Sequence, residues 1–94
     1  MIEINTKVQN PTGLHARPSA ILVMNAIKFD SNIWFKAKGQ TIDAKVLLPL
    51  VSLKLKCGDD ITIAADGSDE KEAVNFLSEI LDTKFGEVNK EENL

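Results

Sequence analysis

The position of one proline limits where the first helix of this chain can begin. Between residues 16 and 28, apolar side chains recur three or four positions apart, as on one face of an amphipathic helix. Pro18 falls inside this segment, and a proline has no N–H to donate to the helix ladder. It is tolerated only in the first turn, where that N–H would lack an intrahelical partner. The helix is therefore predicted to begin at or just after His15. Its predicted apolar stripe consists of Ala16, Ala20, Val23 and Ile27, widened by Ile21 and Met24.

Other segments show the alternation typical of strands. Residues 2–8 alternate in polarity, with the apolar side chains on one predicted face, and turn-forming residues follow at 9–13. The segments "NIWFKAKG" and "QTIDAK" predict two strands around a tight turn at residues 38–40. The segment "DDITIAADG" predicts a fourth strand whose two isoleucines face the same way.

Two further segments predict helices. The run "VLLPLVSLKL" at 46–55 is too uniformly apolar for a half-exposed strand, and Pro49 argues against a central one. We therefore predict a short helix there, with Pro49 early in it. The last helix is predicted to start at a capping box formed by Asp69 and Glu72 and to stop near Gly86.

The predicted order β-α-β-β-α-β-α indicates an α+β fold. A sheet of four strands has one face that amphipathic helices can cover, so we expect all three helices on the same side. The 94 residues suit one domain. We place this domain at residues 1–86, followed at 87–94 by a polar, frayed tail without a core-forming run.

The numbers of cysteines, histidines and charges argue against several function classes. A single cysteine, Cys57, excludes an intramolecular disulfide, and a single histidine argues against a structural zinc site. The formal net charge of −3 argues against a general nucleic-acid binder. No segment has the apolar length of a membrane span. We therefore expect a cytoplasmic protein without metal or cofactor, and a buried, inert Cys57.

The only histidine and the only arginine lie two residues apart in "GLHARP", residues 13–18. If His15 caps the helix, the unpaired N–H groups of Ala16 and Arg17 form an anion site at its positive end. A phosphoryl group on the imidazole would be held by these amides and by the guanidinium, which can make two parallel hydrogen bonds. The residues alone also allow a polar cap beside a solvated arginine, so both interpretations stay open at this point.

The motif "GLHARP" resembles the active-site signature of HPr, the histidine-containing phosphocarrier of the bacterial phosphoenolpyruvate-dependent sugar phosphotransferase system (PTS). The similarity runs from about Ile4 to Phe85 and includes "GQTIDAK", "DDITIAADG" and "DEKEAV" in the family's order. It implies an open-faced β-sandwich of four antiparallel strands under three helices.

The resemblance also implies a role for each residue of the motif. Phosphorylated enzyme I would transfer its phosphoryl group to Nδ1 of His15, and Arg17 would stabilise it together with the amides of Ala16 and Arg17. A histidine on a IIA domain of a sugar permease would then accept it. The chain would be a carrier in a relay, not a stand-alone enzyme.

The chain departs from the family at the start of the second helix. Where many HPr proteins carry a regulatory serine, it has Val46, which offers no hydroxyl to a kinase. The resemblance implies that apolar residues of this helix dock on enzyme I and IIA domains. We expect this docking surface to consist of Leu14, Leu47, Leu48 and Val51. Leu50 and Leu53 are expected in the core. Three lysines flank the surface and either steer acidic partners or are solvated charges: Lys45, Lys54 and Lys56.

Two alternatives to the sugar carrier remain open. One is the carrier of the nitrogen-related regulatory branch, which has the same fold and motif. The other is an HPr-like module that binds a partner without transferring phosphate. Known modules of that type lack the histidine, so the presence of His15 and Arg17 favours a carrier. A shuttle that passes between partners is expected to be a monomer.

Overall fold

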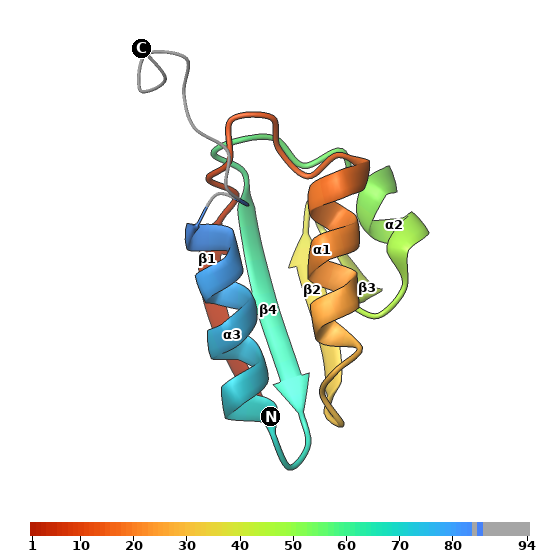
Figure 1. Ribbon diagram of the computed structural model, residues 1–94, viewed down its shortest axis with the longest axis vertical. Coiled ribbons are helices and arrows are strands. Elements are labelled where there is room, and N and C mark those ends of the chain that lie inside the picture. The colour runs from red at the N-terminus through yellow and green to blue at the C-terminus, as the bar shows by residue number, and fades with distance from the viewer. Residues whose placement is uncertain (84, 86–94) are drawn as a thin grey trace.

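The computed structural model describes residues 1–83 and 85 of the chain (Figure 1). The elements follow the predicted order. They are β1 (Ile2–Lys7), α1 (Ala16–Ala26), β2 (Asn32–Ala37), β3 (Gln40–Asp43), α2 (Leu47–Ser52), β4 (Asp60–Asp66) and α3 (Glu70–Asp82). The expected domain end at residue 86 and the polar tail at 87–94 lie outside the described residues.

The four strands form one antiparallel sheet in the order β1-β4-β2-β3. Ile63 of β4 lies opposite Ile4 of β1 on one side and Phe35 of β2 on the other, so the two central strands place apolar side chains in one row. Figure 1 shows all three helices on one face of this sheet. The buried side chains lie between the two layers. The expected fold, an open-faced sandwich, is confirmed.

Helix α1 begins at Ala16 with His15 as its N-cap, as the position of Pro18 predicts. The predicted apolar stripe, however, is partly wrong. Ala16 is exposed, and Met24 and Ile27 are 66% and 57% exposed. The buried face instead consists of Pro18, Ser19, Leu22, Val23 and Ala26. Two overlapping faces of this helix both show apolar spacing, and the sheet buries the one that contains Leu22.

Helix α2 is short and begins after Val46, with Pro49 as its third residue. Pro49 is tolerated there because the first N–H groups of a helix have no intrahelical acceptor. Leu50 and Leu53 are 0% and 6% exposed, which confirms their expected place in the core. The β2–β3 turn also agrees with its prediction, since Lys38 and Gly39 both have positive φ.

Cys57 is exposed, which corrects the expectation of a buried thiol. It lies in the loop between α2 and β4, next to Lys56 and Gly58, where no periodic apolar pattern would bury it. Its Sγ approaches the backbone oxygen of Gln9 at 3.5 Å.

Asp69 is the N-cap of α3, but the predicted capping box is wrong because its side chain makes no cap hydrogen bond. Its carboxylate instead accepts hydrogen bonds from the N–H groups of Asp30 and Ser31, at 2.8 and 2.9 Å, and from the Ser31 hydroxyl. The Ser31 hydroxyl, followed by the Asp30 N–H, lowers the pKa of Asp69 below its ordinary value of 3.8. This carboxylate therefore ties the start of α3 to the segment between α1 and β2.

Asp69→Asn is expected to lower the Tm at pH 7, because it removes the charged acceptor of these bonds. The folded pKa lies below the unfolded value, so this stabilisation is fully present above the unfolded pKa and is lost as the pH falls through the folded pKa. The Tm difference from the wild type should therefore be largest near neutral pH and shrink below about pH 4. Thermal melts followed by circular dichroism measure it.

Asp30→Asn is the matched control, because it makes the same change in charge at a residue that contacts Asp69 through its backbone alone. A Tm difference for Asp69→Asn that stays constant with pH would show that the carboxylate charge does not stabilise this junction.

Candidate functional site

The loop between β1 and α1 places His15 at the start of the helix through a few backbone contacts. Gly13 has a positive φ of 74°, and its N–H donates to the Asn10 oxygen at 3.0 Å. The Asn10 side-chain amide donates back to the Gly13 oxygen at 2.6 Å. Leu14 N–H then donates to the Leu55 oxygen at 2.8 Å, which fastens the loop to the segment after α2. The turn residues thus end β1, and the hydrogen bonds of this loop hold His15 in a fixed position at the start of α1.

His15 is exposed and has extended backbone angles, and its carbonyl accepts the Ser19 N–H at 3.1 Å, as expected of an N-cap. The predicted position of His15 at the helix start is confirmed. Its Nε2 lies 2.9 Å from the Thr12 hydroxyl. Ala16 and Arg17 follow in the first turn, and both are exposed. The imidazole, the guanidinium and the amino end of α1 therefore share one accessible corner of the molecule.

A shallow hollow of about 320 Å³ lies beside His15. It brings together the loop before α1, the first turn of α1 and the chain after α2. Its lining residues are Thr12, Leu14, His15, Ala16, Val51, Lys54, Leu55 and Lys56. Lys54 and Lys56, two of the three lysines expected to flank the docking surface, therefore line the same hollow as His15, where their charge can attract an anion. The third, Lys45, donates its Nζ to the Phe29 oxygen at 2.7 Å instead.

Helix α2 and the neighbouring α1 expose apolar side chains. Val46, Leu47 and Leu48 are 46%, 39% and 73% exposed. We call the exposed large apolar residues of these two helices and of their caps the α1–α2 surface; they are Met24, Ile27, Val46, Leu47 and Leu48. Val51 is half-buried. Met24 and Ile27 were missed as surface residues because their spacing also fits the core stripe.

Leu14 does not belong to this surface. Its side chain is 1% exposed and packs in the hydrophobic core, which corrects its expected place in a docking surface. Because Leu14 packs in the core, it anchors the loop directly before His15, whose side chain is exposed to solvent.

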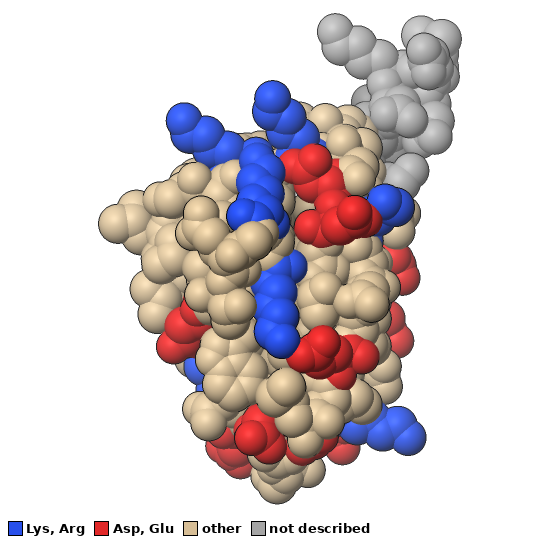
Figure 2. Space-filling view, turned by 180° about the vertical axis from the view of Figure 1, so that it is seen from behind, with Lys and Arg blue, Asp and Glu red and all other residues tan. Residues whose placement is uncertain are grey.

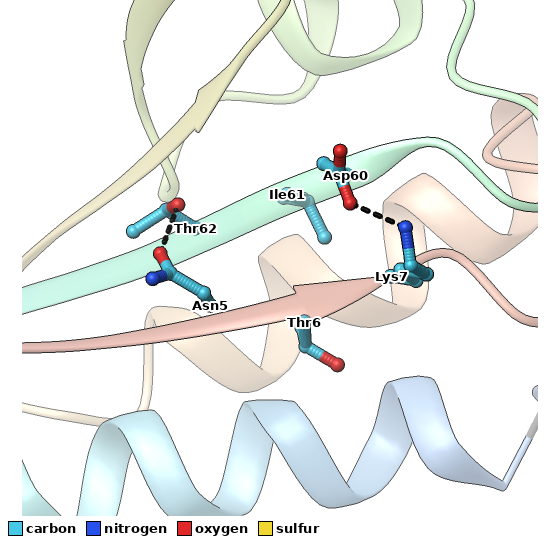
Figure 3. Close-up of a pocket in the computed structure, with 6 residues that line it drawn as sticks. All are labelled: Asn5, Thr6, Lys7, Asp60, Ile61 and Thr62. Atoms are coloured by element: carbon cyan, nitrogen blue, oxygen red, sulfur yellow. Dashed lines mark hydrogen bonds and ion pairs between the residues drawn. The ribbon is translucent and has the colours of Figure 1, made fainter.

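A second hollow, of about 430 Å³, lies along β1 and β4 (Figure 3). The polar side chains on one face of these strands bond to each other across them. Lys7 pairs with Asp60 at 2.6 Å, and the Thr62 hydroxyl donates to Asn5 Oδ1 at 2.6 Å. Figure 3 shows Thr6 and Ile61 pointing to the other face. Because these polar groups already bond to one another, the hollow is a weaker candidate site than the corner at His15.

Two further observations concern only the part of the chain that the structure describes. It contains no group of three or more His, Cys, Asp or Glu residues placed to hold a metal ion. It also contains no helix with the length and apolar character needed to cross a bilayer.

Comparison with protein families identifies the chain. Residues 2–83 match the family model of the PTS HPr component phosphorylation site. The chain belongs to the HPr family. This assignment agrees with the fold, with the exposed N-cap histidine and with the family resemblance of the motif at residues 13–18.

Individual relatives in this family include proteins named Crh and proteins named HPr. The HPr-like protein Crh of Halalkalibacterium halodurans is 39% identical over 77 residues, which cover 82% of this chain and 92% of the relative. The HPr-C-His structure from Thermoanaerobacter tengcongensis has a TM-score of 0.90 at 38% identity and covers 95% of this chain and all of that one. A crystal structure of Crh from Bacillus subtilis, described as a swapped, intertwined dimer, has a TM-score of 0.70 at 31% identity, covering 95% of this chain and all of that one.

Proposed function

We propose that this protein accepts a phosphoryl group on His15 from phosphorylated enzyme I and passes it to a IIA domain of the sugar PTS. One observation carries the proposal: the chain's only imidazole is exposed at the N-cap of α1, with its only guanidinium two residues away. In the first step, Nδ1 attacks the phosphorus as the bond to the enzyme I donor breaks. In the second, a histidine nitrogen of the IIA domain attacks the phosphorus as its bond to Nδ1 breaks, which leaves His15 free to accept again. Such a carrier acts in the cytoplasm and as a monomer.

The surroundings of His15 suit this chemistry. Phosphoryl transfer depends mainly on positioning and on stabilising the charge of the transferred group. The amides at the amino end of α1 and the Arg17 guanidinium supply donors, and Lys54 and Lys56 add positive charge in the adjoining hollow. The first-turn amides and dipole contribute a modest stabilisation, about 0.3–1 kcal/mol. A modest value suits a carrier, which must also release its phosphate.

The α1–α2 surface supports the partner assignment. A phosphoryl group moves between two histidines only when the partner closes over the site. The exposed apolar side chains of α2 offer area for that contact, and the same helix contributes Val51 to the hollow at His15. Val46 stands in this surface without a hydroxyl, so we propose that serine phosphorylation does not regulate docking here.

The decisive experiment is a two-step transfer. The protein is incubated with enzyme I and phosphoenolpyruvate, and intact-mass spectrometry should show one added phosphoryl group that is lost in acid. Addition of an unphosphorylated IIA domain should then remove the group. Absence of labelling with a cognate enzyme I would refute the carrier role. Parallel rates with enzymes I of the sugar and nitrogen-related branches decide which branch the protein serves.

Thr12→Val is expected to slow phosphorylation of His15 by about three- to tenfold, the cost of one hydrogen bond. Thr12 bonds Nε2, the ring nitrogen other than the proposed acceptor, and so fixes the ring orientation. Quenched-flow labelling with enzyme I measures the rate. Thr12→Ser keeps the hydroxyl and should retain most of the rate; equal losses in both variants would show that the methyl packing matters instead.

A second function is favoured by the relatives named Crh, one of which is 39% identical to this chain. Under this alternative, the protein regulates a partner by docking through the α1–α2 surface without transferring phosphate. The presence of His15 and Arg17 favours the carrier role over this regulatory role. A partner that binds His15→Ala unchanged, while the wild type shows no phosphate turnover, would favour the regulator.

A further inference from the structure

Helix α3 has an exposed face that the proposed phosphate transfer does not use. Four of its residues recur three or four positions apart on the side away from the core: Glu72, Asn75, Phe76 and Glu79. Phe76 is 41% exposed, an unusual position for a large aromatic side chain on an otherwise polar face. The core positions of this helix are already filled by other residues, so burial within the chain does not explain it.

Phe76 forms one wall of an aromatic hollow. Its ring meets the ring of Phe29 edge to face, with centroids 5.9 Å apart and an interplanar angle of 60°. The hollow has a volume of about 340 Å³ and is lined by Phe29, Glu72, Asn75, Phe76 and Glu79. Lys45 holds the Phe29 backbone oxygen but does not line the hollow, and none of the described residues that form its walls is cationic.

The two carboxylates of this hollow differ from those on the opposite face of the molecule. There, Figure 2 shows lysines interleaved with acidic groups, and Lys7 and Lys36 pair with Asp60 and Glu3 at 2.6 Å. Within residues 1–83 and 85, neither Glu72 nor Glu79 has an ion-pair partner. Their charges therefore remain available to a binding partner.

We propose that this hollow is a docking site for a basic segment of a protein partner, with an arginine side chain as its anchor. A guanidinium stacks favourably on an aromatic face and makes paired hydrogen bonds to a carboxylate, and the hollow supplies both groups side by side. Its volume is large enough for one such side chain and lies within the range of ordinary binding clefts. The charge of the rim selects a basic partner over an acidic one.

The site lies apart from His15. Phe29 follows the carboxyl end of α1, whereas His15 caps its amino end, and a helix of 11 residues is about 16 Å long. Docking at the hollow therefore leaves His15 at the other end of α1 accessible. The inference goes beyond the proposed carrier function and does not depend on it.

The test titrates the isotopically labelled full chain with a capped hexapeptide, Gly-Leu-Arg-Arg-Leu-Gly, and with the same peptide carrying glutamate in place of arginine. Amide shifts in heteronuclear NMR spectra should change around Phe29 and residues 72–79 with the basic peptide and not with the acidic one. Phe76→Ala should weaken binding about tenfold. Glu72→Gln combined with Glu79→Gln should do the same, and it leaves the aromatic packing intact.

The control variant combines Glu3→Gln with Asp60→Asn, which removes equal charge from the opposite face. It should bind the basic peptide as the wild type does. Equal weakening in the control, or shifts spread over all acidic residues, would reduce the effect to net charge and overturn the proposal. Shifts at the hollow that depend on protein concentration without peptide would assign it to a second copy of the chain instead. Labelling of His15 by enzyme I should be unchanged in every variant, so the result is independent of the carrier function.

Discussion

His15→Ala is expected to reduce labelling by enzyme I and phosphoenolpyruvate from about one phosphoryl group per chain to none, because it removes the proposed nucleophile. The substitution should leave the fold intact. His15 is exposed, its φ of −78° suits any residue, and its side chain makes no cap hydrogen bond to the helix. The substitution also removes the exposed hydrogen bond to Thr12, so we expect a loss of no more than about 1 kcal/mol in the free energy of unfolding. Intact-mass spectrometry and urea melts measure the two quantities.

Retention of one acid-labile phosphoryl group in His15→Ala would refute the assignment of the acceptor. A label that is stable in acid would have a different meaning, since it would indicate an ester on a hydroxyl rather than a phosphoramidate. Arg17→Lys is a useful comparison, because a lysine keeps the positive charge but cannot form the two parallel bonds of a guanidinium. This variant should still be labelled, which separates the acceptor from the group that stabilises the phosphate.

Much of the fold is predictable from local sequence rules. Pro18 restricts the start of α1 to one place, and the alternation within β4 correctly predicts that Ile61 and Ile63 face the core together. These rules succeed because each depends on a few neighbouring residues and on the geometry of one element. The family resemblance adds that the four strands are antiparallel, which the strand pairing confirms.

The errors share a different cause, since each depends on contacts between distant segments. The face of α1 that packs on the sheet is one of two that the apolar spacing allows, and only the tertiary fold selects it. The spacing of Asp69 and Glu72 fits a capping box, yet Asp69 finds its partners at residues 30 and 31. Local patterns cannot show such alternatives, because the competing partner is far away in sequence.

The same limit applies to the candidate site. The sequence correctly predicts His15 at the helix start, but the expected place of Leu14 on the surface is wrong because the structure buries it. The support that holds the loop comes from Leu55, about forty residues along the chain. No periodicity links these two segments. The placement of the histidine thus depends on a contact that only the structure shows, and this contact can be tested through the glycine beside it.

Gly13→Ala is expected to lower the free energy of unfolding by about 2–3 kcal/mol and to slow labelling of His15 by at least tenfold. A methyl group at Gly13 would lie 2.5 Å from the Leu55 oxygen and 3.0 Å from the Lys56 Cα, so the loop must move away. The left-handed backbone with a φ of 74° costs an L-residue roughly 1–2 kcal/mol, and loss of the Leu14–Leu55 hydrogen bond adds about 1 kcal/mol. A displacement of about 1 Å at a reacting group can cost 10²-fold in rate, which accounts for the slower labelling.

Gly39→Ala separates backbone strain from the clash. Gly39 has almost the same φ, 76°, but a methyl group there meets nothing within 4 Å. It should therefore show the strain alone, about 1–2 kcal/mol in urea melts, with an unchanged labelling rate. If both variants lose the same stability and both keep the rate, the contact with Leu55 does not position His15. If only Gly13→Ala loses both the additional stability and the labelling rate, the contact between its loop and Leu55 positions His15. The reactivity of His15 then depends on the packing of the segment that follows α2.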